Sequence, residues 1–163
     1  MARCLYCGKS GIFLSLSTNG LCSNCDRVVS LTAGSNFRVF KESYDLIQKT
    51  DNPEVVKKRI FLIKRSLSFL YELEMKGINV STPPPSQMMR TLYEEQDNYY
   101  SACFDRSYRK MVIKINSLKQ PNAQLANIKI FLSMIDEYVP ELINKNSLDI
   151  IREKAKVFST SLQ

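Results

Sequence analysis

Cys4-Leu5-Tyr6-Cys7 and Cys22-Ser23-Asn24-Cys25 form two Cys-x-x-Cys pairs near the start of a chain of 163 residues. Two thiolates at this spacing wrap around one side of a metal ion, and the fourteen residues between the pairs are long enough for a short hairpin. We therefore predict one structural Zn²⁺ bound by Cys4, Cys7, Cys22 and Cys25. Four thiolates complete a tetrahedral shell, so this ion would have no open position for water or substrate.

The segment between the pairs alternates apolar and small polar residues, which predicts a strand over residues 12–16 that enters a turn. Gly8 suits the first metal-binding knuckle, because a side chain there would obstruct the backbone amides. Helical spacing begins after Cys25, so we expect the second pair at the start of a helix. A hairpin followed by such a helix is a treble-clef-like arrangement. Its expected core residues are Phe13, Leu14 and Leu16.

Three features follow one another in this segment: a Cys-x-x-Cys-Gly knuckle over residues 4–8, an apolar strand over 12–16, and a Gly-Leu-Cys-x-x-Cys knuckle over 20–25. The combination resembles the N-terminal zinc-ribbon segments of uncharacterised bacterial and phage proteins. The resemblance covers residues 4–25 only. It implies zinc binding without implying an activity, because such modules are attached to many functions. The rest of the chain shows no such resemblance.

Residues 1–33 form the predicted zinc-binding module. About thirty residues bury too little apolar surface to fold alone, whereas a structural zinc contributes about 10 kcal/mol or more. We therefore expect the module to be unfolded without metal. Its charged side chains are those of Arg3, Lys9, Asp26 and Arg27, which provide too few cations for a dedicated phosphate-binding finger. The module is expected to cap the helical body or to contact a protein.

The pattern of apolar residues over 34–163 predicts an α-helical body, which we expect to be a bundle of about five helices. Apolar residues over 37–47 lie three or four apart, and this helix can continue from the metal site if it runs through Gly34. Asn52-Pro53 is a good N-cap and first residue for a central helix that ends near Gly77. The expected buried face of this central helix consists of Val56, Ile60, Ile63, Leu67 and Leu70.

The second half of the chain is divided by prolines. Residues 78–85 end in three consecutive prolines and predict an extended connector. Ser86 is the expected cap of a long segment that forms either one helix or two in tandem. Pro121 begins the next helix, and Pro140 interrupts it. A last helix is expected after residue 146 or 147.

The composition is that of an ordinary globular protein, with 44% hydrophobic and 24% charged residues. The formal net charge is +7, and four thiolates bound to Zn²⁺ would lower it to about +5. No apolar run precedes Cys4, and later apolar stretches are interrupted by Lys or Arg, so we expect no signal peptide, membrane span or membrane partner. Thiolate ligands persist in a reducing compartment, which predicts a cytoplasmic protein.

Residues suited to catalysis are sparse. The chain contains no histidine, so a serine or cysteine nucleophile would lack its usual base. Cys103 falls on an apolar helix face with Tyr99, where a buried structural thiol is expected. A solvated helix face explains Glu94, Glu95 and Asp97. We predict no enzymatic activity, no small-molecule substrate and no cofactor other than one zinc ion.

Basic residues gather in two helical segments and are the candidates for binding nucleic acid or another partner. In the first segment they repeat at seven-residue spacing, and in the second they follow several aromatic residues that can stack on bases. For each segment alone, a solvated helix face with its aromatic residues in the core is the favoured interpretation; together, the two segments could form a single positive groove if folding brings the helices side by side. The candidate residues are Lys57, Lys58, Lys64, Arg65, Arg106, Arg109, Lys110 and Lys114.

The sequence supports three hypotheses of different kinds. The favoured one is a non-enzymatic, zinc-stabilised adaptor or regulator that binds a macromolecular partner, with protein favoured over nucleic acid; a phage-type modulator of a host factor is one form of it. The second is a DNA- or RNA-binding factor that uses the basic helix faces. The third is an accessory subunit whose partner supplies an enzyme's active site.

Overall fold

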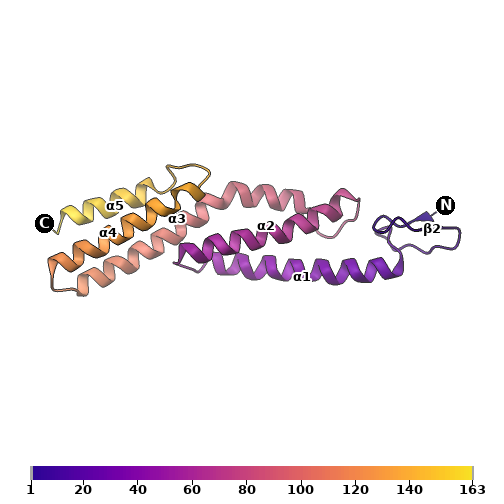
Figure 1. Cartoon of the computed structure of the whole chain (residues 1–163), viewed down its shortest axis with the longest axis horizontal. Helices are drawn as coiled ribbons and strands as arrows, with labels where there is room; N and C mark the ends of the chain where they lie inside the picture. Colours follow the sequence, from indigo (N-terminus) through magenta and orange to yellow (C-terminus); the bar gives the residue numbers. More distant parts are fainter. Residues whose placement is uncertain (1, 163) are drawn as a thin grey trace. The chain divides into compact units, whose positions relative to one another are not determined.

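A computed structural model describes residues 2–162, and Figure 1 shows its elements in chain order. Two short strands, β1 (Ala2–Arg3) and β2 (Ser10–Gly11), pair antiparallel. Five α-helices and one 3-10 helix follow within the described residues: α1 (Ser23–Ile47), α2 (Pro53–Met75), α3 (Pro85–Ser117), α4 (Pro121–Tyr138), η1 (Val139–Glu141) and α5 (Asp149–Thr160). The predicted mainly α-helical fold with a small N-terminal hairpin is therefore confirmed.

The chain packs into two compact units whose boundaries cut across the long helices. Unit 1 contains the described residues up to Tyr44 together with Phe61–Tyr93. Unit 2 contains Asp45–Ile60 together with the described residues from Glu94 onward. Helices α1, α2 and α3 each contribute to both units, and residue 33, the predicted end of the zinc module, lies inside α1.

Helices α1 and α3 are both continuous. Helix α1 runs through Gly34, and α3 is a single helix of 33 residues, so the long segment before Pro121 does not divide into two helices. Helix α2 begins at Pro53 as predicted, with the side-chain oxygen of Asn52 accepting the Glu54 amide at 3.0 Å. Among residues 2–162, no helix has both the length and the apolar composition needed to cross a membrane.

A small apolar cluster in unit 1 joins the cysteine-rich segment to the end of α2. Its buried members are Cys4, Leu21, Val29, Leu73 and Ile78. Helix α2 ends at Met75, and Gly77, two residues later, has positive φ. The Gly77 amide donates to the Glu74 carbonyl at 2.8 Å, and the Ile78 amide donates to the Leu73 carbonyl at 3.0 Å. This pair of bonds is the Schellman motif, which places Ile78 against Leu73 in the cluster.

The connector after α2 ends one residue earlier than predicted. Helix α3 begins at Pro85, and the Gln87 amide donates to the Pro84 carbonyl at 3.0 Å. The prediction that Ser86 is the N-cap is therefore wrong. Ser86 lies in the first turn, where its amide and hydroxyl donate to the Glu74 carboxylate at 2.8 and 2.6 Å. The carboxylate at a helix N-terminus is favourable and ties the two ends of the connector together.

Unit 2 is built around buried aromatic side chains. Phe104 has no exposed surface, and its ring forms T-shaped pairs with those of Phe131 and Tyr138 at centroid distances of 6.2 and 6.0 Å. Such edge-to-face pairs add to the stabilisation from burial alone. Tyr100 is also buried and lies 6.1 Å from Tyr138 between ring centroids. Cys103 is fully buried beside this cluster, as the helical spacing predicted.

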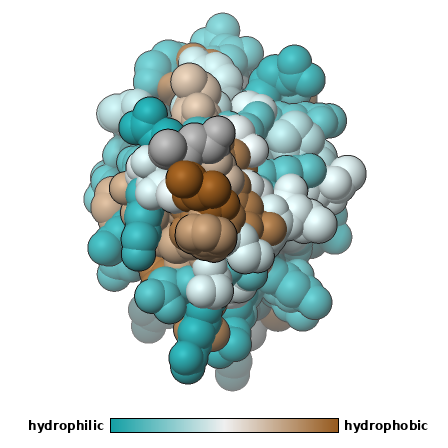
Figure 2. All heavy atoms as spheres, turned by 90° about the vertical axis from the view of Figure 1, so that its right-hand side faces the viewer, coloured by the Kyte–Doolittle hydropathy of each residue, from teal (hydrophilic) through white to brown (hydrophobic). Residues whose placement is uncertain are grey.

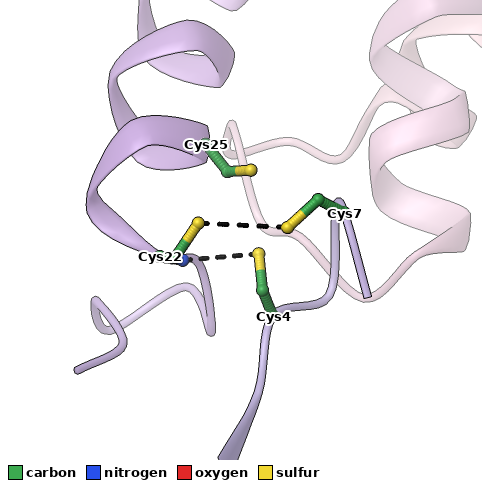
Figure 3. Close-up of side chains that lie close together, drawn as sticks. All are labelled: Cys4, Cys7, Cys22 and Cys25. Atoms are coloured by element: carbon green, nitrogen blue, oxygen red, sulfur yellow. Dashed lines mark hydrogen bonds between the residues drawn. The ribbon is translucent and has the colours of Figure 1, made fainter. Parts of the chain in front are cut away.

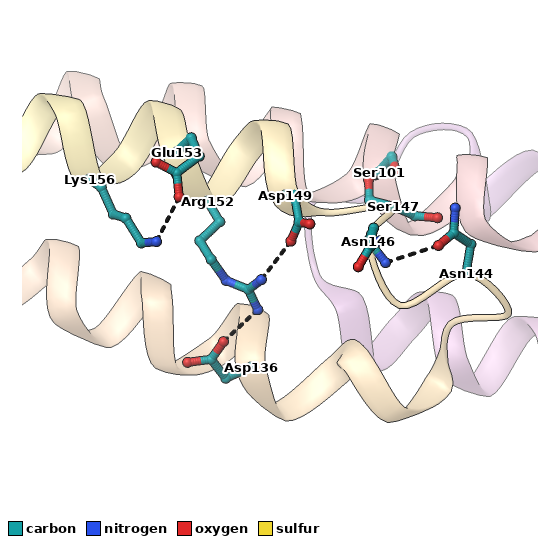
Figure 4. A network of polar contacts seen from close by, with 9 residues as sticks. All are labelled: Ser101, Asp136, Asn144, Asn146, Ser147, Asp149, Arg152, Glu153 and Lys156. Atoms are coloured by element: carbon teal, nitrogen blue, oxygen red, sulfur yellow. Dashed lines mark hydrogen bonds and ion pairs between the residues drawn. The ribbon is translucent and has the colours of Figure 1, made fainter.

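Polar side chains hold the segment between α4 and α5. The carboxylate of Asp97, for which the sequence indicated only a solvated helix face, accepts the amides of Ile143 and Asn144 at 2.8 and 2.7 Å. Arg152 of α5 reaches across to Asp136 of α4 at 2.6 Å (Figure 4). These contacts fix α5 against the rest of unit 2.

Candidate metal centre

The four predicted ligands come together at the N-terminal end of α1 (Figure 3). Cys4 and Cys7 lie between β1 and β2, Cys22 immediately precedes α1, and Cys25 is in its first turn. All four Sγ atoms lie within 4.8 Å of one another, and those of Cys7 and Cys22 are 4.0 Å apart. A tetrahedral ion with metal–sulfur bonds of about 2.3 Å requires sulfur atoms about 3.8 Å apart. A small contraction thus lets one metal ion bind all four.

The backbone of the first knuckle turns toward the sulfur atoms. Gly8 has φ of 72°, which an L side chain rarely adopts, and its amide donates to the Cys4 carbonyl at 2.9 Å. The Cys4 amide donates to the Lys9 carbonyl at 2.8 Å. The Cys22 amide in turn donates to Cys4 Sγ at 3.3 Å. Amide donors aimed at sulfur favour the thiolate form that a metal ion requires.

Two thiols of the cluster have pKa values shifted in opposite directions. Hydrogen bonds from the backbone, first from Cys7 and then from Cys22, lower the pKa of Cys4 from 9.0 to about 6. The hydrogen bond with the Cys22 thiol, and then burial, raise the pKa of Cys25 to about 12. Without a cation, loss of the proton from Cys25 is therefore unfavourable, and thiolates this close to one another repel. A bound cation would remove this penalty.

A second glycine fixes how the knuckle packs. Gly20 has φ of 70°, and a Cβ there would lie 2.8 Å from Cδ1 of Leu5. The Leu5 amide donates to the Gly20 carbonyl at 3.0 Å. The ammonium of Lys76, just beyond α2, lies 4.9 Å from the ring centroid of Tyr6. These contacts attach residues 2–25, which we call the cysteine module, to the end of α2.

The predicted strand over residues 12–16 is wrong. The chain reverses directly after β2 in a turn in which the Leu14 amide donates to the Gly11 carbonyl at 3.5 Å. Of the predicted strand, only Leu16 forms a bridge, opposite Cys22. Pairing of β2 fixes the chain up to Gly11, and the bridge to Cys22 fixes it again at Leu16. The residues between these two points reverse the chain direction and so cannot form a strand.

Two large apolar side chains occupy the corners of this turn. Ile12 is 81% exposed and Phe13 is 99% exposed, so the prediction of Phe13 as a core residue is wrong. Leu14 and Leu16 are partly buried against the apolar cluster of unit 1, as predicted. We call Ile12 and Phe13 the tip. Figure 2 faces the end of the chain that carries the module and shows apolar side chains gathered at its centre.

The signal for the tip was present in the sequence. Two adjacent large apolar residues follow Gly11, and the turn begins directly after this glycine. The charged residues of the module before Asp26 are of one sign: Arg3 of β1 and Lys9, which directly precedes β2, are exposed, and residues 2–25 include no Asp or Glu.

The candidate basic residues are distributed over both units. Lys64 and Arg65 lie in unit 1 and the other six in unit 2. Most of those in unit 2 have partners within that unit: Lys57 with Glu141 at 2.8 Å, Lys58 with Glu54 at 3.6 Å, Arg109 with Asp105 at 2.6 Å, and Lys110 with Asp51. Arg106 donates to the carbonyls of Thr50 and Ile47 at 2.8 and 3.2 Å. Lys114 lies in the last turn of α3.

Comparison of the chain with protein-family models, with curated protein sequences and with solved structures finds no match in any of the three.

Proposed function

We propose that the chain is a zinc-stabilised adaptor or regulator, without catalytic activity, that binds another protein through its cysteine module. The observation that carries this proposal is the tip, with Ile12 and Phe13 81% and 99% exposed. Turn corners ordinarily hold Gly, Pro, Asn, Asp or Ser. Two adjacent large apolar side chains in such positions contribute little to the fold, and departures from local sequence rules concentrate at functional sites.

The donor set supports zinc as the metal. Four cysteine sulfur atoms that converge within 4.8 Å of one another are a soft, tetrahedral set, which zinc prefers over hard cations such as Mg²⁺ or Ca²⁺. A site of four thiolates is closed, so its role would be to hold the module in shape. The same thiolates favour a reducing compartment, and we place the protein in the cytoplasm.

The absence of catalytic activity is supported by the groups outside the metal centre. The sequence contains no histidine, so the most common general base is missing. Cys103, the fifth cysteine, has no exposed surface, and burial raises its pKa to about 12. Its thiol is therefore protonated at neutral pH and a poor nucleophile.

A protein partner is favoured over nucleic acid by the charges. The cysteine module has only two basic side chains, Arg3 and Lys9, so it could neutralise few phosphate groups of a nucleic acid. Among the helical candidates, Lys57, Arg106 and Lys110 already bond to groups within unit 2. An exposed apolar tip instead matches the apolar anchors that dominate protein interfaces.

The test is affinity capture with the full-length, metal-loaded chain from nuclease-treated native lysate under reducing conditions. The wild-type chain is expected to retain a stoichiometric protein partner, and Phe13→Ser is expected to lose it. Ile113→Ser is the matched control, because Ile113 is 72% exposed on α3 and far from the tip in sequence. A partner that is retained from untreated lysate but lost from nuclease-treated lysate would indicate nucleic acid. Equal capture by Phe13→Ser and wild type would refute binding through the tip.

A further inference from the structure

A groove in unit 1 lies along α1 and beside the connector after α2. It has a volume of about 290 Å³, and its apolar lining residues are Leu21, Val29, Ala33, Phe37 and Val80. This volume lies just below the range of about 300–1,000 Å³ for small-molecule sites. The groove is therefore suited to one or two inserted side chains instead of a larger ligand. We call it the α1 groove.

The α1 groove and the tip are complementary in charge as well as in polarity. The one charged residue that lines the groove is Asp26. The tip directly follows β2; the residue before β2, Lys9, and the residue paired with Ser10, Arg3, are both exposed cations, and no Asp or Glu occurs in residues 2–25. An acidic groove edge that faces the cations of the module carrying the tip favours this pairing and disfavours two tips or two grooves meeting each other.

A glycine at the groove supports an occupant. Gly34 lines the α1 groove within the helix, where glycine is less favourable than alanine. A Cβ on Gly34 would have nothing within 4 Å apart from the helix itself, so the folded chain offers no steric reason for glycine there. Close approach of another chain to the α1 backbone would provide one.

We propose that the Ile12–Phe13 tip of one copy of the chain binds in the α1 groove of a second copy. This inference rests on the proposed function, since it names the partner that the tip binds. The contact is small, with two anchoring side chains and one acidic edge, so the association is expected to be weak and rapidly reversible. Interfaces below about 1,200 Å² of total buried surface behave in this way.

Sedimentation equilibrium of the purified, metal-loaded chain tests this proposal directly. Over protein concentrations of about 10 µM to 1 mM, the average mass is expected to rise above the 18.8 kDa of one chain. Phe13→Ser is expected to weaken the association about 10- to 100-fold, because it removes one large apolar side chain from the contact. Ile113→Ser should associate like the wild type.

A second variant blocks the groove without harming the helix. Gly34→Leu places a good helix former at an open position, so thermal stability should be retained or increased while association is lost. An equimolar mixture of Phe13→Ser and Gly34→Leu provides a complementation test. The first variant keeps its groove and the second keeps its tip, so the mixture should associate more strongly than either variant alone.

Two results would overturn the proposal. One is a wild-type chain that stays monomeric up to about 1 mM. The other is that Phe13→Ser alone and Gly34→Leu alone each associate as strongly as the wild type. The first result leaves the proposed function to be judged by lysate capture. If a monomeric chain still captures a different protein in a manner that depends on Phe13, the second copy is excluded and protein binding stands. If neither self-association nor Phe13-dependent capture occurs, both proposals are wrong.

Discussion

The cysteine module and the aromatic core of unit 2 use large apolar residues in opposite ways. In unit 2, Phe104 is completely buried among other rings. In the cysteine module, Phe13 is 99% exposed, and the buried positions beside it belong to Cys4 and Leu21. A module that binds a metal ion through four cysteines would not depend on its largest apolar side chains for folding. Those side chains are then free to serve in contacts with other molecules.

This difference predicts that the two regions fail independently. The module is expected to lose its structure when the metal is removed, even though the helices keep their cores. Unit 2 is expected to lose stability when a side chain of its aromatic cluster is truncated, even though the metal centre remains intact.

Removing one ligand should produce the largest effect. Cys22→Ser is expected to abolish metal binding and to unfold residues 2–25, because a structural zinc of this kind contributes about 10 kcal/mol. The amide signals of the module in a two-dimensional NMR spectrum should collapse to unfolded positions, whereas those of unit 2 should stay dispersed. Elemental analysis should find no metal, compared with one ion per wild-type chain.

Cys103→Ala is the control for Cys22→Ser, because Cys103 is a buried cysteine of unit 2 that lies outside the ligand cluster. It should keep one metal ion per chain. A metal-free Cys22→Ser chain with a folded module would show that metal is not what holds the module together.

Truncating the aromatic core should produce the next largest effect. Phe104→Ala is expected to lower the free energy of unfolding by about 3–5 kcal/mol, as is typical when a buried ring is removed. Urea titration followed by helical circular dichroism measures this loss. Ile113→Ala on the same helix is the control, because its 72% exposed side chain should change stability by about 0.5 kcal/mol or less. Release of the metal by Phe104→Ala would contradict separate stabilisation of the two regions.

Local signals made the main elements predictable from the sequence. Asn52 with Pro53, Gly77 and Pro121 each mark a helix end through their own backbone preferences, and the structure places helix ends beside all of them. The ligand set was predictable for the same reason, since Cys-x-x-Cys spacing is a property of a few consecutive residues.

Features that depend on distant partners were missed. The turn at Ile12 and Phe13 is imposed by the knuckle on one side and the bridge between Leu16 and Cys22 on the other. Asp97 binds the amide of Ile143, which lies 46 positions away in sequence, so helical spacing alone gave it no role. Such roles follow from tertiary packing, which apolar periodicity does not encode.

The smallest expected effect is a difference in unfolding free energy between two variants of basic residues in unit 2. It distinguishes a residue that stabilises the fold from one that only lies on the surface. Arg106 donates to the carbonyls of Thr50 and Ile47 at 2.8 and 3.2 Å, near the C-terminal end of α1, where carbonyls lack helical partners. Arg106→Met should therefore cost about 1–3 kcal/mol of unfolding free energy. Arg109→Met, which removes an exposed pair with Asp105, should cost about 0.5 kcal/mol or less. Urea titration compares the two variants. Equal, small losses of unfolding free energy would mean that Arg106 does not cap α1. If both variants then also weakened binding to a nonspecific DNA duplex equally, both residues would be assigned to a nucleic-acid surface.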